Sequence, residues 1–408
     1  MTPLHGVRIL DLSRILAGPW ATQLLADLGA EVLKIERPGS GDDTRHWGPP
    51  WLADGEGQAT SESAYYLSCN RGKRSLAIDF TQPDGAELVR TLAADSAVLV
   101  ENFKVGGLAK YGLDYASLRA LNPRLVYCSI TGYGQTGPYA QRAGYDAAIQ
   151  AQGGLMSITG EPDGAPGGGP QKVGVAVADL MTGMYATTGI LAALRHAEAT
   201  GVGQHIDLAL LDTQVGWLAN QALNYLVGGS LPQRRGTAHP NIVPYQVMPA
   251  ADGHFMLAVG NDGQFQRLCE IIGEPALASD PRYASNAARV SHRDELIAHL
   301  SGMLQTRPVA DWLGLLEAHG VPCAPVNRID QVFADPQVQA RGMRIGLPHA
   351  LGADVPLVAN PLRFSATPVQ YTRAPPLLGA DTRALLCERL GLDEARIEAL
   401  LTAGVIGV

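Results

Sequence analysis

The sequence predicts an α/β protein built on a parallel sheet with helices on both faces. Short apolar runs alternate with helix-like stretches through the first half of the chain, and residues 31–36 and 97–102 are clear examples of such runs. Strands that are buried on both faces read as continuous apolar runs, and strand–helix alternation is typical of parallel sheets. Functional groups of such sheets lie in the loops that follow the carboxyl ends of the strands.

The elements follow in order along the chain. Pro19 opens the first predicted helix, and Gly29 ends it. The predicted strands of the first part cover 6–12, 31–36, 75–80, 97–102 and 124–132, with helices over 19–28 and 85–95 and a helix ending near 123. The later part predicts a strand over 173–178, a helix over 180–198, a strand and a long helix within 203–229, a hairpin over 248–260, helices to about 320, and a helical pair in the tail.

Composition narrows the class of protein. The 408 residues are 46% apolar and carry a net charge of −8, which argues against a nucleic-acid partner and a polybasic membrane surface. No uncharged apolar run reaches the length of a membrane span, and no secretory leader is recognisable. The five cysteines are scattered and form no ligand set. We therefore expect a cytoplasmic protein with reduced thiols.

The common cofactor and nucleophile motifs are missing. The stretch "NRGKRS" (70–75) only partly matches a phosphate loop, and no predicted strand runs into GxGxxG. The sequence contains neither GxSxG nor HExxH, and its ten histidines show no metal-ligand spacing. We expect no bound metal and no permanently held cofactor.

Asp179 is the carboxylate that invites a functional interpretation. It follows the apolar run 173–178 and precedes a helix with small residues at about every third position. An aspartate there is a good helix N-cap, which is a purely structural role. At the end of a strand beside the Gly- and Pro-rich stretch 160–172, it could instead be a covalent nucleophile toward an acyl group.

Basic residues form a second group. Each lies in a predicted loop beside a strand end, where it is either a solvated surface charge or part of a site for a phosphate-bearing ligand. These residues are Arg37, Lys73, Arg74, Lys104, Lys110 and Arg142.

Several long motifs, taken in order, resemble the class III CoA-transferase family over nearly the whole chain. They include "LHGVRILDLSRILAGPWATQLLADLGAEVLKIERPGSGDDTR" (4–45), "CNRGKRSLAIDF", "VGVAVADLMTGMYATTGILAAL" and "PPLLGADT". The resemblance implies a Rossmann-like large domain with a parallel sheet, a smaller α+β domain, and an interlocked homodimer. On this basis we expect residues 1–200 and 325–408 to form the large domain, 225–324 the small one, and 201–224 a linking helical region.

The resemblance also implies residue roles. Asp179 matches the family's catalytic aspartate, which attacks an acyl-CoA thioester and then carries CoA as an aspartyl thioester. The residues that match CoA-binding positions are Arg37, Lys73, Arg74, Asn102, Lys110 and Arg142, and Asp146 matches an acidic residue that orients its partners. The 236–240 loop is a candidate source of oxyanion-binding amides.

Two alternatives to CoA transfer remain. Racemases of the same fold use a histidine in a "GHD" motif as a base, but this chain has Tyr145 there, which favours the transferase. A non-catalytic acyl-CoA-binding protein could do without Asp179. Leu16 stands where formyl-CoA transferases have glutamine, which argues against formyl or oxalate substrates.

The stretch 234–246 is similar to transferases that act on dicarboxylates. We therefore expect succinyl-CoA as donor and an acceptor such as glutarate, hydroxymethylglutarate, citramalate or itaconate. Arg14, Arg235 and His239 are candidates to bind the second carboxylate. Alternatively, the two arginines are solvated rim residues and His239 is a turn residue before Pro240.

Overall fold

The computed structural model describes residues 1–408 and divides into two compact units. The larger unit comprises Met1–Gly154, Gly174–Trp217 and Pro336–Val408. The smaller unit comprises Leu155–Val173 and Leu218–Asp335. The domain boundaries expected from the sequence stay a prediction.

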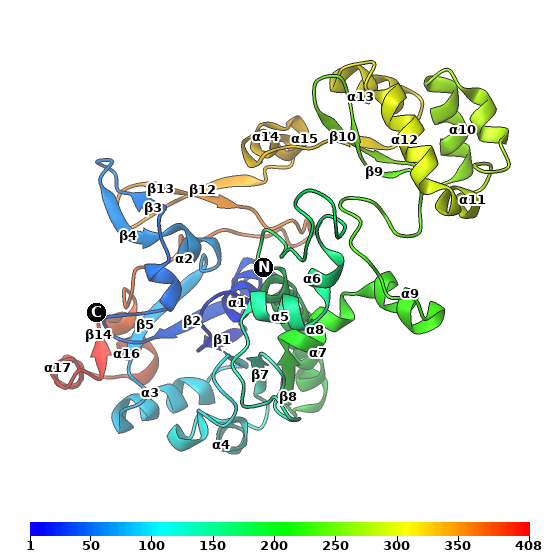
Figure 1. The fold of residues 1–408 in the computed structure, drawn as a ribbon. Helices are drawn as coiled ribbons and strands as arrows, with labels where there is room; N and C mark the ends of the chain where they lie inside the picture. The colour runs from blue at the N-terminus through cyan, green and yellow to red at the C-terminus, as the bar shows by residue number, and fades with distance from the viewer. The chain divides into compact units, whose positions relative to one another are not determined.

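A seven-stranded sheet forms the centre of the larger unit (Figure 1). Its order is β14-β5-β2-β1-β6-β7-β8, and all neighbours are parallel except β14 and β5. The strands are β1 (Arg8–Asp11), β2 (Glu31–Glu36), β5 (Lys73–Ile78), β6 (Val98–Glu101), β7 (Val126–Thr131), β8 (His205–Ala209) and β14 (Ile406–Gly407). This confirms the parallel sheet predicted from the apolar runs.

Helices cover both faces of this sheet. Successive side chains of a strand point to opposite faces, so each buried strand contributes apolar side chains to a core on either side. Leu99 of β6 packs into one core, and its neighbours Val98 and Val100 pack into the other. The first core holds residues of α3 (Pro83–Ala94), α4 (Tyr115–Leu121), α16 (Thr382–Leu390) and α17 (Glu394–Thr402). The second holds residues of α1 (Ala17–Asp27), α5 (Asp146–Gln152), α7 (Val177–Thr200) and α8 (Leu210–Gly216).

The chain order creates a switch point between β1 and β6. From β1 the chain builds outward through β2 to β5, and then it returns to place β6 on the other side of β1. Loops at the carboxyl ends of two such strands diverge and leave a crevice, which is where open α/β sheets bind ligands.

Short elements complete the larger unit. Two antiparallel pairs consist of β3 (Trp51–Ala53) with β4 (Ala59–Ser63) and of β12 (Arg344–Pro348) with β13 (Asp354–Val358). The short helices are η1 (Asp43–His46), α2 (Ala64–Ser68), η2 (Ala109–Tyr111) and α15 (Pro336–Ala340).

The smaller unit is built on a three-stranded antiparallel sheet, in the order β11-β10-β9. The hairpin of β9 (Tyr245–Pro249) and β10 (His254–Ala258) confirms the one predicted around Asp252-Gly253. The remaining elements are α6 (Leu155–Ile158), α9 (Ala219–Gly228), α10 (Asp262–Ile271), η3 (Pro275–Ser279), α11 (Asn286–Ser291), α12 (Arg293–Leu304), α13 (Val309–Ala318), β11 (Cys323–Pro325) and α14 (Ile329–Ala334).

Two predicted elements were wrong. Residues 173–178 form no strand, because Val177 and Ala178 already belong to the first turn of α7. A short apolar run does not distinguish a strand from a buried helix. The long helix predicted within 203–229 is two helices, α8 and α9, which are separated by Trp217 and Leu218, and Ala219 at the start of α9 has a positive φ of 44°.

Helix α7 is long and apolar enough to cross a membrane by length and composition alone, a test that core helices of soluble proteins also pass. Its buried side chains, Ala186 and Ile190 among them, belong to the core on one face of the sheet.

Candidate active site

A cavity of about 730 Å³ opens at the carboxyl end of the sheet in the larger unit. Its walls come mainly from the segments that follow β1, β2, β5, β6 and β7, with Asp179 of α7 and Leu210 of α8 added. The cavity therefore occupies the switch point between β1 and β6, as expected for an open α/β sheet.

Asp179 lines this cavity from the first turn of α7. It is partly buried, and its carboxylate oxygens accept no hydrogen bond. Burial, followed by the nearby charge of Asp146, raises the pKa of Asp179 to about 7. A carboxylate that is poorly solvated and unpaired is more basic, and hence more nucleophilic once ionised, than one on the surface.

Asp146 takes the capping role that the sequence had offered to Asp179. The N-cap of α7 is Ala176, which has no capping side chain. Asp146 Oδ1 instead accepts hydrogen bonds from the backbone N–H of Ala178 at 2.8 Å and of Asp179 at 3.4 Å. The N-cap interpretation of Asp179 is therefore wrong, and its side chain is left available to the cavity.

Small residues on α7 let α1 approach closely beside Asp179. A Cβ placed on Gly183 would lie 2.7 Å from the Ala17 carbonyl oxygen and 3.0 Å from Trp20 Cδ1. Gly183 lies four residues after Asp179, and residues at that spacing share one face of a helix. The start of α1 therefore packs against the same face of α7 that carries Asp179.

Four cations line the cavity without forming a salt bridge, and all four are exposed. Lys110 Nζ lies 4.7 Å from the centre of the Tyr111 ring, and the Arg142 guanidinium lies 3.9 Å from that of Tyr139. Unpaired cations around a cavity suit a ligand with several phosphate charges. These cations are Arg37, Lys104, Lys110 and Arg142.

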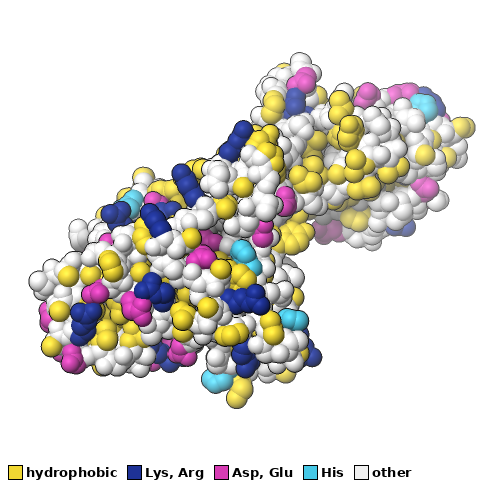
Figure 2. Space-filling view, turned by 90° about the horizontal axis from the view of Figure 1, so that it is seen from below, with side chains coloured by type: hydrophobic (Ala, Val, Ile, Leu, Met, Phe, Trp, Pro, Cys, Tyr) yellow, Lys and Arg dark blue, Asp and Glu magenta, His cyan; other side chains and the backbone are white.

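On one face of the larger unit the basic residues are spread out. On the face of the larger unit drawn in Figure 2, Lys and Arg side chains are interspersed with acidic and apolar ones rather than gathered into one broad patch. On that face, no broad basic patch marks a site for an anion.

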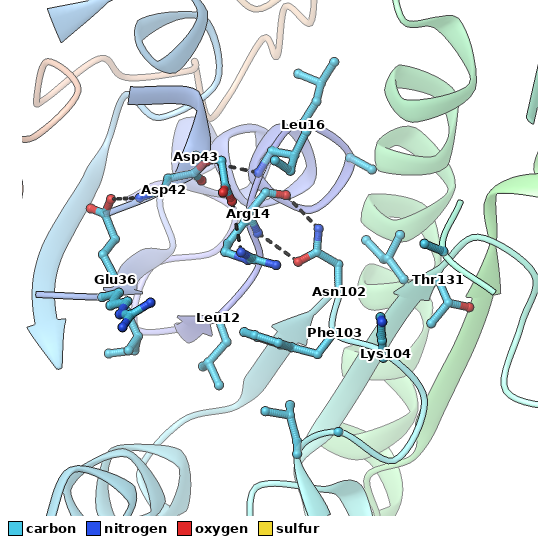
Figure 3. A pocket seen from close by; sticks show the side chains of 18 of the residues that line it. Leu12, Arg14, Leu16, Glu36, Asp42, Asp43, Asn102, Phe103, Lys104 and Thr131 are labelled. Carbon is cyan, nitrogen blue, oxygen red and sulfur yellow. Dashed lines mark hydrogen bonds and ion pairs between the residues drawn. The ribbon is translucent and has the colours of Figure 1, made fainter. Parts of the chain in front are cut away.

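The other cavity residues predicted from the sequence have partners of their own. Arg14 Nη1 pairs with Asp43 at 2.9 Å, and Asn102 forms two hydrogen bonds with the Arg14 backbone (Figure 3). Leu16 is buried in the wall, and Tyr145 is 64% exposed.

The structure does not bring Lys73 and Arg74 to the cavity. Lys73 is buried in β5, where its Nζ contacts Asp11, Asn70 and the Pro19 carbonyl oxygen at 2.8–3.0 Å. A side chain held this way does not reach a ligand in this conformation. The Arg74 guanidinium pairs with carboxylates of three residues, Glu31, Asp381 and Glu388. Both cations tie the sheet to its surroundings, and their CoA contact stays a prediction.

Arg235 and His239 belong to the smaller unit. Arg235 is exposed, and His239 Nδ1 accepts a hydrogen bond from Asn241 N–H at 3.0 Å. Partial burial, followed by the charge of Arg293, lowers the pKa of His239. Their role toward a second carboxylate, and that of loop 236–240 toward an oxyanion, stays a prediction.

The groups that shape the cavity wall next to β1 were not predicted from the sequence. Asp42 is buried, pairs with Lys34 at 2.9 Å, and accepts a hydrogen bond from the Ile15 N–H. Burial opposes the ionisation of Asp42, but Lys34 prevails and lowers its pKa to about 2. The acidic pair after the turn at 38–41 was the available signal for Asp42, whereas nothing in the sequence marked Ile15. No group of three or more His, Cys, Asp or Glu side chains in residues 1–408 is arranged to hold a metal.

Comparison with known proteins identifies the family. Residues 4–382 match the family model described as CoA-transferase family III. The chain belongs to this family. It is therefore an enzyme whose substrates are CoA thioesters, and the resemblance stated from the motifs is confirmed.

Two relatives and a solved structure are similar to this chain over 95% or more of its length. The chain is 54% identical over 386 residues to the succinate–glutarate CoA-transferase of Agrobacterium fabrum, which covers 95% of each protein. It is 45% identical over 406 residues to the succinyl-CoA:glutarate CoA-transferase of Mus musculus, which covers 100% of this chain and 91% of the mouse protein. The crystal structure of a CAIB/BAIF family protein from Brucella suis matches with a TM-score of 0.83 and 51% identity, covering 95% of this chain and 99% of that one.

Proposed function

We propose that this family III CoA-transferase moves CoA from succinyl-CoA to a dicarboxylate, with Asp179 as the covalent carrier. The observation that supports this most strongly is the state of Asp179, which is unpaired, partly buried and exposed to the cavity at the switch point. The four unpaired cations around the same cavity provide for the phosphates of CoA.

The reaction begins with Asp179 in its ionised form. Its carboxylate oxygen attacks the thioester carbonyl of succinyl-CoA, the C–S bond breaks, and a mixed anhydride and the CoA thiolate form. The thiolate then attacks the Asp179 carbonyl carbon, which gives an aspartyl-CoA thioester and releases succinate.

The second half runs the same steps in reverse. A carboxylate of the acceptor attacks the aspartyl thioester, the thiolate leaves, and a new mixed anhydride forms. The thiolate attacks the acceptor's carbonyl carbon, which yields the new acyl-CoA and restores the Asp179 carboxylate. No proton or electron is gained or lost overall, so the cycle needs no general base beyond the nucleophile itself.

The substrate class is inferred from the relatives. The similar proteins named above are a succinate–glutarate and a succinyl-CoA:glutarate transferase, which favours succinyl-CoA as donor and glutarate or a related dicarboxylate as acceptor. We assign Arg235 and His239 to the second carboxylate of these acids, with Arg14 as a further candidate.

We also infer an interlocked homodimer in the cytoplasm, as the family resemblance implied. Exposed apolar side chains on and after α9 support an association between copies, because large apolar patches on a free surface are unusual. Light scattering on the purified protein tests this, and a monomer at micromolar concentration would contradict it.

The test of function is an exchange assay with two readouts. Wild-type protein is incubated with succinyl-CoA and a panel of acids, and each new acyl-CoA is measured by chromatography. The proposal predicts transfer to dicarboxylates such as glutarate, with ping-pong kinetics. Exchange of the α-proton in deuterated water without transfer would identify a racemase instead, and CoA binding without either reaction would identify a binding protein.

A further inference from the structure

The loop that joins β1 to α1, residues 12–16, holds a residue in a strained conformation. Ile15 has a φ of 73°, and only one other non-glycine residue of the chain has a positive φ. This region is unfavourable for residues with a Cβ, and most of all for one with a branched Cβ. Such a conformation persists only where neighbouring groups enforce it, and it is typical of functional sites.

Two side chains, Asn102 and Asp42, bind the backbone that leads into Ile15, which is the segment that sets its φ. Figure 3 shows both side chains beside Arg14. Asn102 accepts a hydrogen bond from the Arg14 N–H at 2.9 Å and donates one to the Arg14 carbonyl at 2.7 Å. Asp42 Oδ1 accepts the Ile15 N–H at 3.2 Å. Asn102 follows β6 and Asp42 follows β2, so the loop is held from both strands that flank β1.

Asp42 and Asn102, the two side chains that bind the loop, differ in their other interactions. Asp42 is buried and forms an ion pair with Lys34, so its removal would leave an unpaired buried charge. Asn102 is half-buried and uncharged, and its amide oxygen and nitrogen both face the loop. Asn102 is therefore the holder that can be changed without disturbing the ionic network below the cavity.

The β1–α1 loop, residues 12–16, is linked to Asp179 through the packing of α1 against α7. Ile15, Leu16 and Ala17 all line the cavity that Asp179 lines. The Ala17 carbonyl lies against Gly183, one turn after Asp179 on the same face of α7. A shift of residues 14–16 would therefore change the wall beside the Asp179 carboxylate.

We propose that Asn102 is a positioning residue for CoA transfer: it holds the strained β1–α1 loop in place beside Asp179 rather than binding CoA. The inference rests on the proposed function of Asp179. It differs from the sequence-based expectation, which made Asn102 a direct CoA contact.

The test is a double-mutant cycle between Asn102→Ala and Ile15→Gly. Glycine adopts a positive φ without cost, so the loop of Ile15→Gly keeps its conformation with less help from Asn102. With Ile15 present, Asn102→Ala should lower kcat about tenfold or more, because small displacements beside a nucleophile are costly. In the Ile15→Gly background, the same change should cost at least about threefold less.

Binding provides the discriminating readout. Titration calorimetry with CoA alone should give a Kd for Asn102→Ala within about threefold of wild type. Lys104→Ala is the matched control, since Lys104 is exposed, lines the same cavity and has no carboxylate partner. It should weaken CoA binding equally in the wild-type and Ile15→Gly backgrounds. Weakened CoA binding by Asn102→Ala that Ile15→Gly does not relieve would overturn the proposal.

The double-mutant cycle still tests the positioning role if no acid accepts CoA in the assay. The proposed function would then have failed, but the same four proteins can be compared by thermal unfolding. Asn102→Ala should lower Tm less in the Ile15→Gly background, and an equal loss in both would contradict the positioning role. Asn102→Asp, which keeps the acceptor for Arg14 N–H and loses the donor, should give an intermediate loss and serves if the alanine variant does not fold.

Discussion

Asp146 caps the helix that carries Asp179, although 33 positions separate the two residues in the chain. Burial is the main cause of the raised pKa of Asp179, and the charge of the same carboxylate that binds the N–H groups of the first turn raises it further. One residue thus fixes the helix end and tunes the nucleophile, and the two effects can be separated by mutation.

Asp146→Asn should shift the pH profile of transfer to lower pH. In wild type, kcat/KM should rise through an apparent pKa of about 7, as Asp179 loses its proton. Asparagine is also a good capping residue, but it removes the charge that disfavours ionisation of Asp179. Asp84→Asn, on a helix of the opposite sheet face, is the control and should leave the profile in place. An unmoved profile for Asp146→Asn would contradict the coupling.

Asp179→Asn should make the protein more stable at alkaline pH. Folded Asp179 keeps its proton up to about pH 7, whereas an unfolded aspartate loses it near its usual value of 3.8. The folded state therefore binds more protons between these values, so the contribution of Asp179 to stability falls as pH rises through this interval. Urea unfolding should show a gain of about 2 kcal/mol for the variant at pH 8, after allowance for partial exposure, and a smaller gain at pH 5. An equal gain in the stability of Asp179→Asn over wild type at pH 8 and pH 5 would argue against a raised pKa of Asp179.

Arg37→Ala and Arg142→Ala should each raise KM for succinyl-CoA by about tenfold, since charge-assisted hydrogen bonds to phosphate contribute roughly 1.5–3 kcal/mol. The effect should shrink at high salt. Arg74→Ala is the comparison, because its guanidinium pairs with Asp381, Glu31 and Glu388 away from the cavity. It should lower Tm and leave KM within about twofold. A large rise in KM for Arg74→Ala with an unchanged Tm would instead indicate that Arg74 binds CoA.

Arg235→Ala should reduce the preference for dicarboxylate acceptors more than the affinity for CoA. The variant loses a cation for the second carboxylate, so kcat/KM for glutarate should fall about tenfold relative to that for a monocarboxylate. Steady-state assays with both acids at a fixed succinyl-CoA concentration measure this ratio. Arg307→Ala, in the same unit, is a control for the removal of a positive charge. An unchanged ratio of kcat/KM for glutarate to that for the monocarboxylate would contradict the assignment of Arg235.

The sequence was a good guide to the elements with strong apolar signals. The strand at 31–36 was predicted with its observed limits, because all but its first residue are buried and a polar turn follows. The sequence singled out Asp179 as a candidate nucleophile, and the structure places it in the cavity wall, while its catalytic role stays a prediction. The strand that was to end at Asp179 does not exist, and the capping role belongs to Asp146.

The rest depended on contacts between distant segments. Lys73 looks like a loop cation in the sequence, but pairing with Asp11 from β1 allows it to be buried within β5. The positive φ of Ile15 has no local signature in the sequence, and the side chains that hold the backbone of Arg14 and Ile15, Asn102 and Asp42, come from other loops. Such features belong to the assembled sheet and cannot be read from one stretch of chain.

The covalent role of Asp179 is tested most directly by intact mass. Wild type and Asp179→Ala are incubated with succinyl-CoA without acceptor, quenched in acid, and measured before and after hydroxylamine treatment. We predict a CoA-sized, hydroxylamine-sensitive adduct on wild type, mapped to the peptide that contains Asp179, and none on the variant. An adduct of equal yield on Asp179→Ala, or turnover by wild type without any adduct in the quenched samples, would contradict the account.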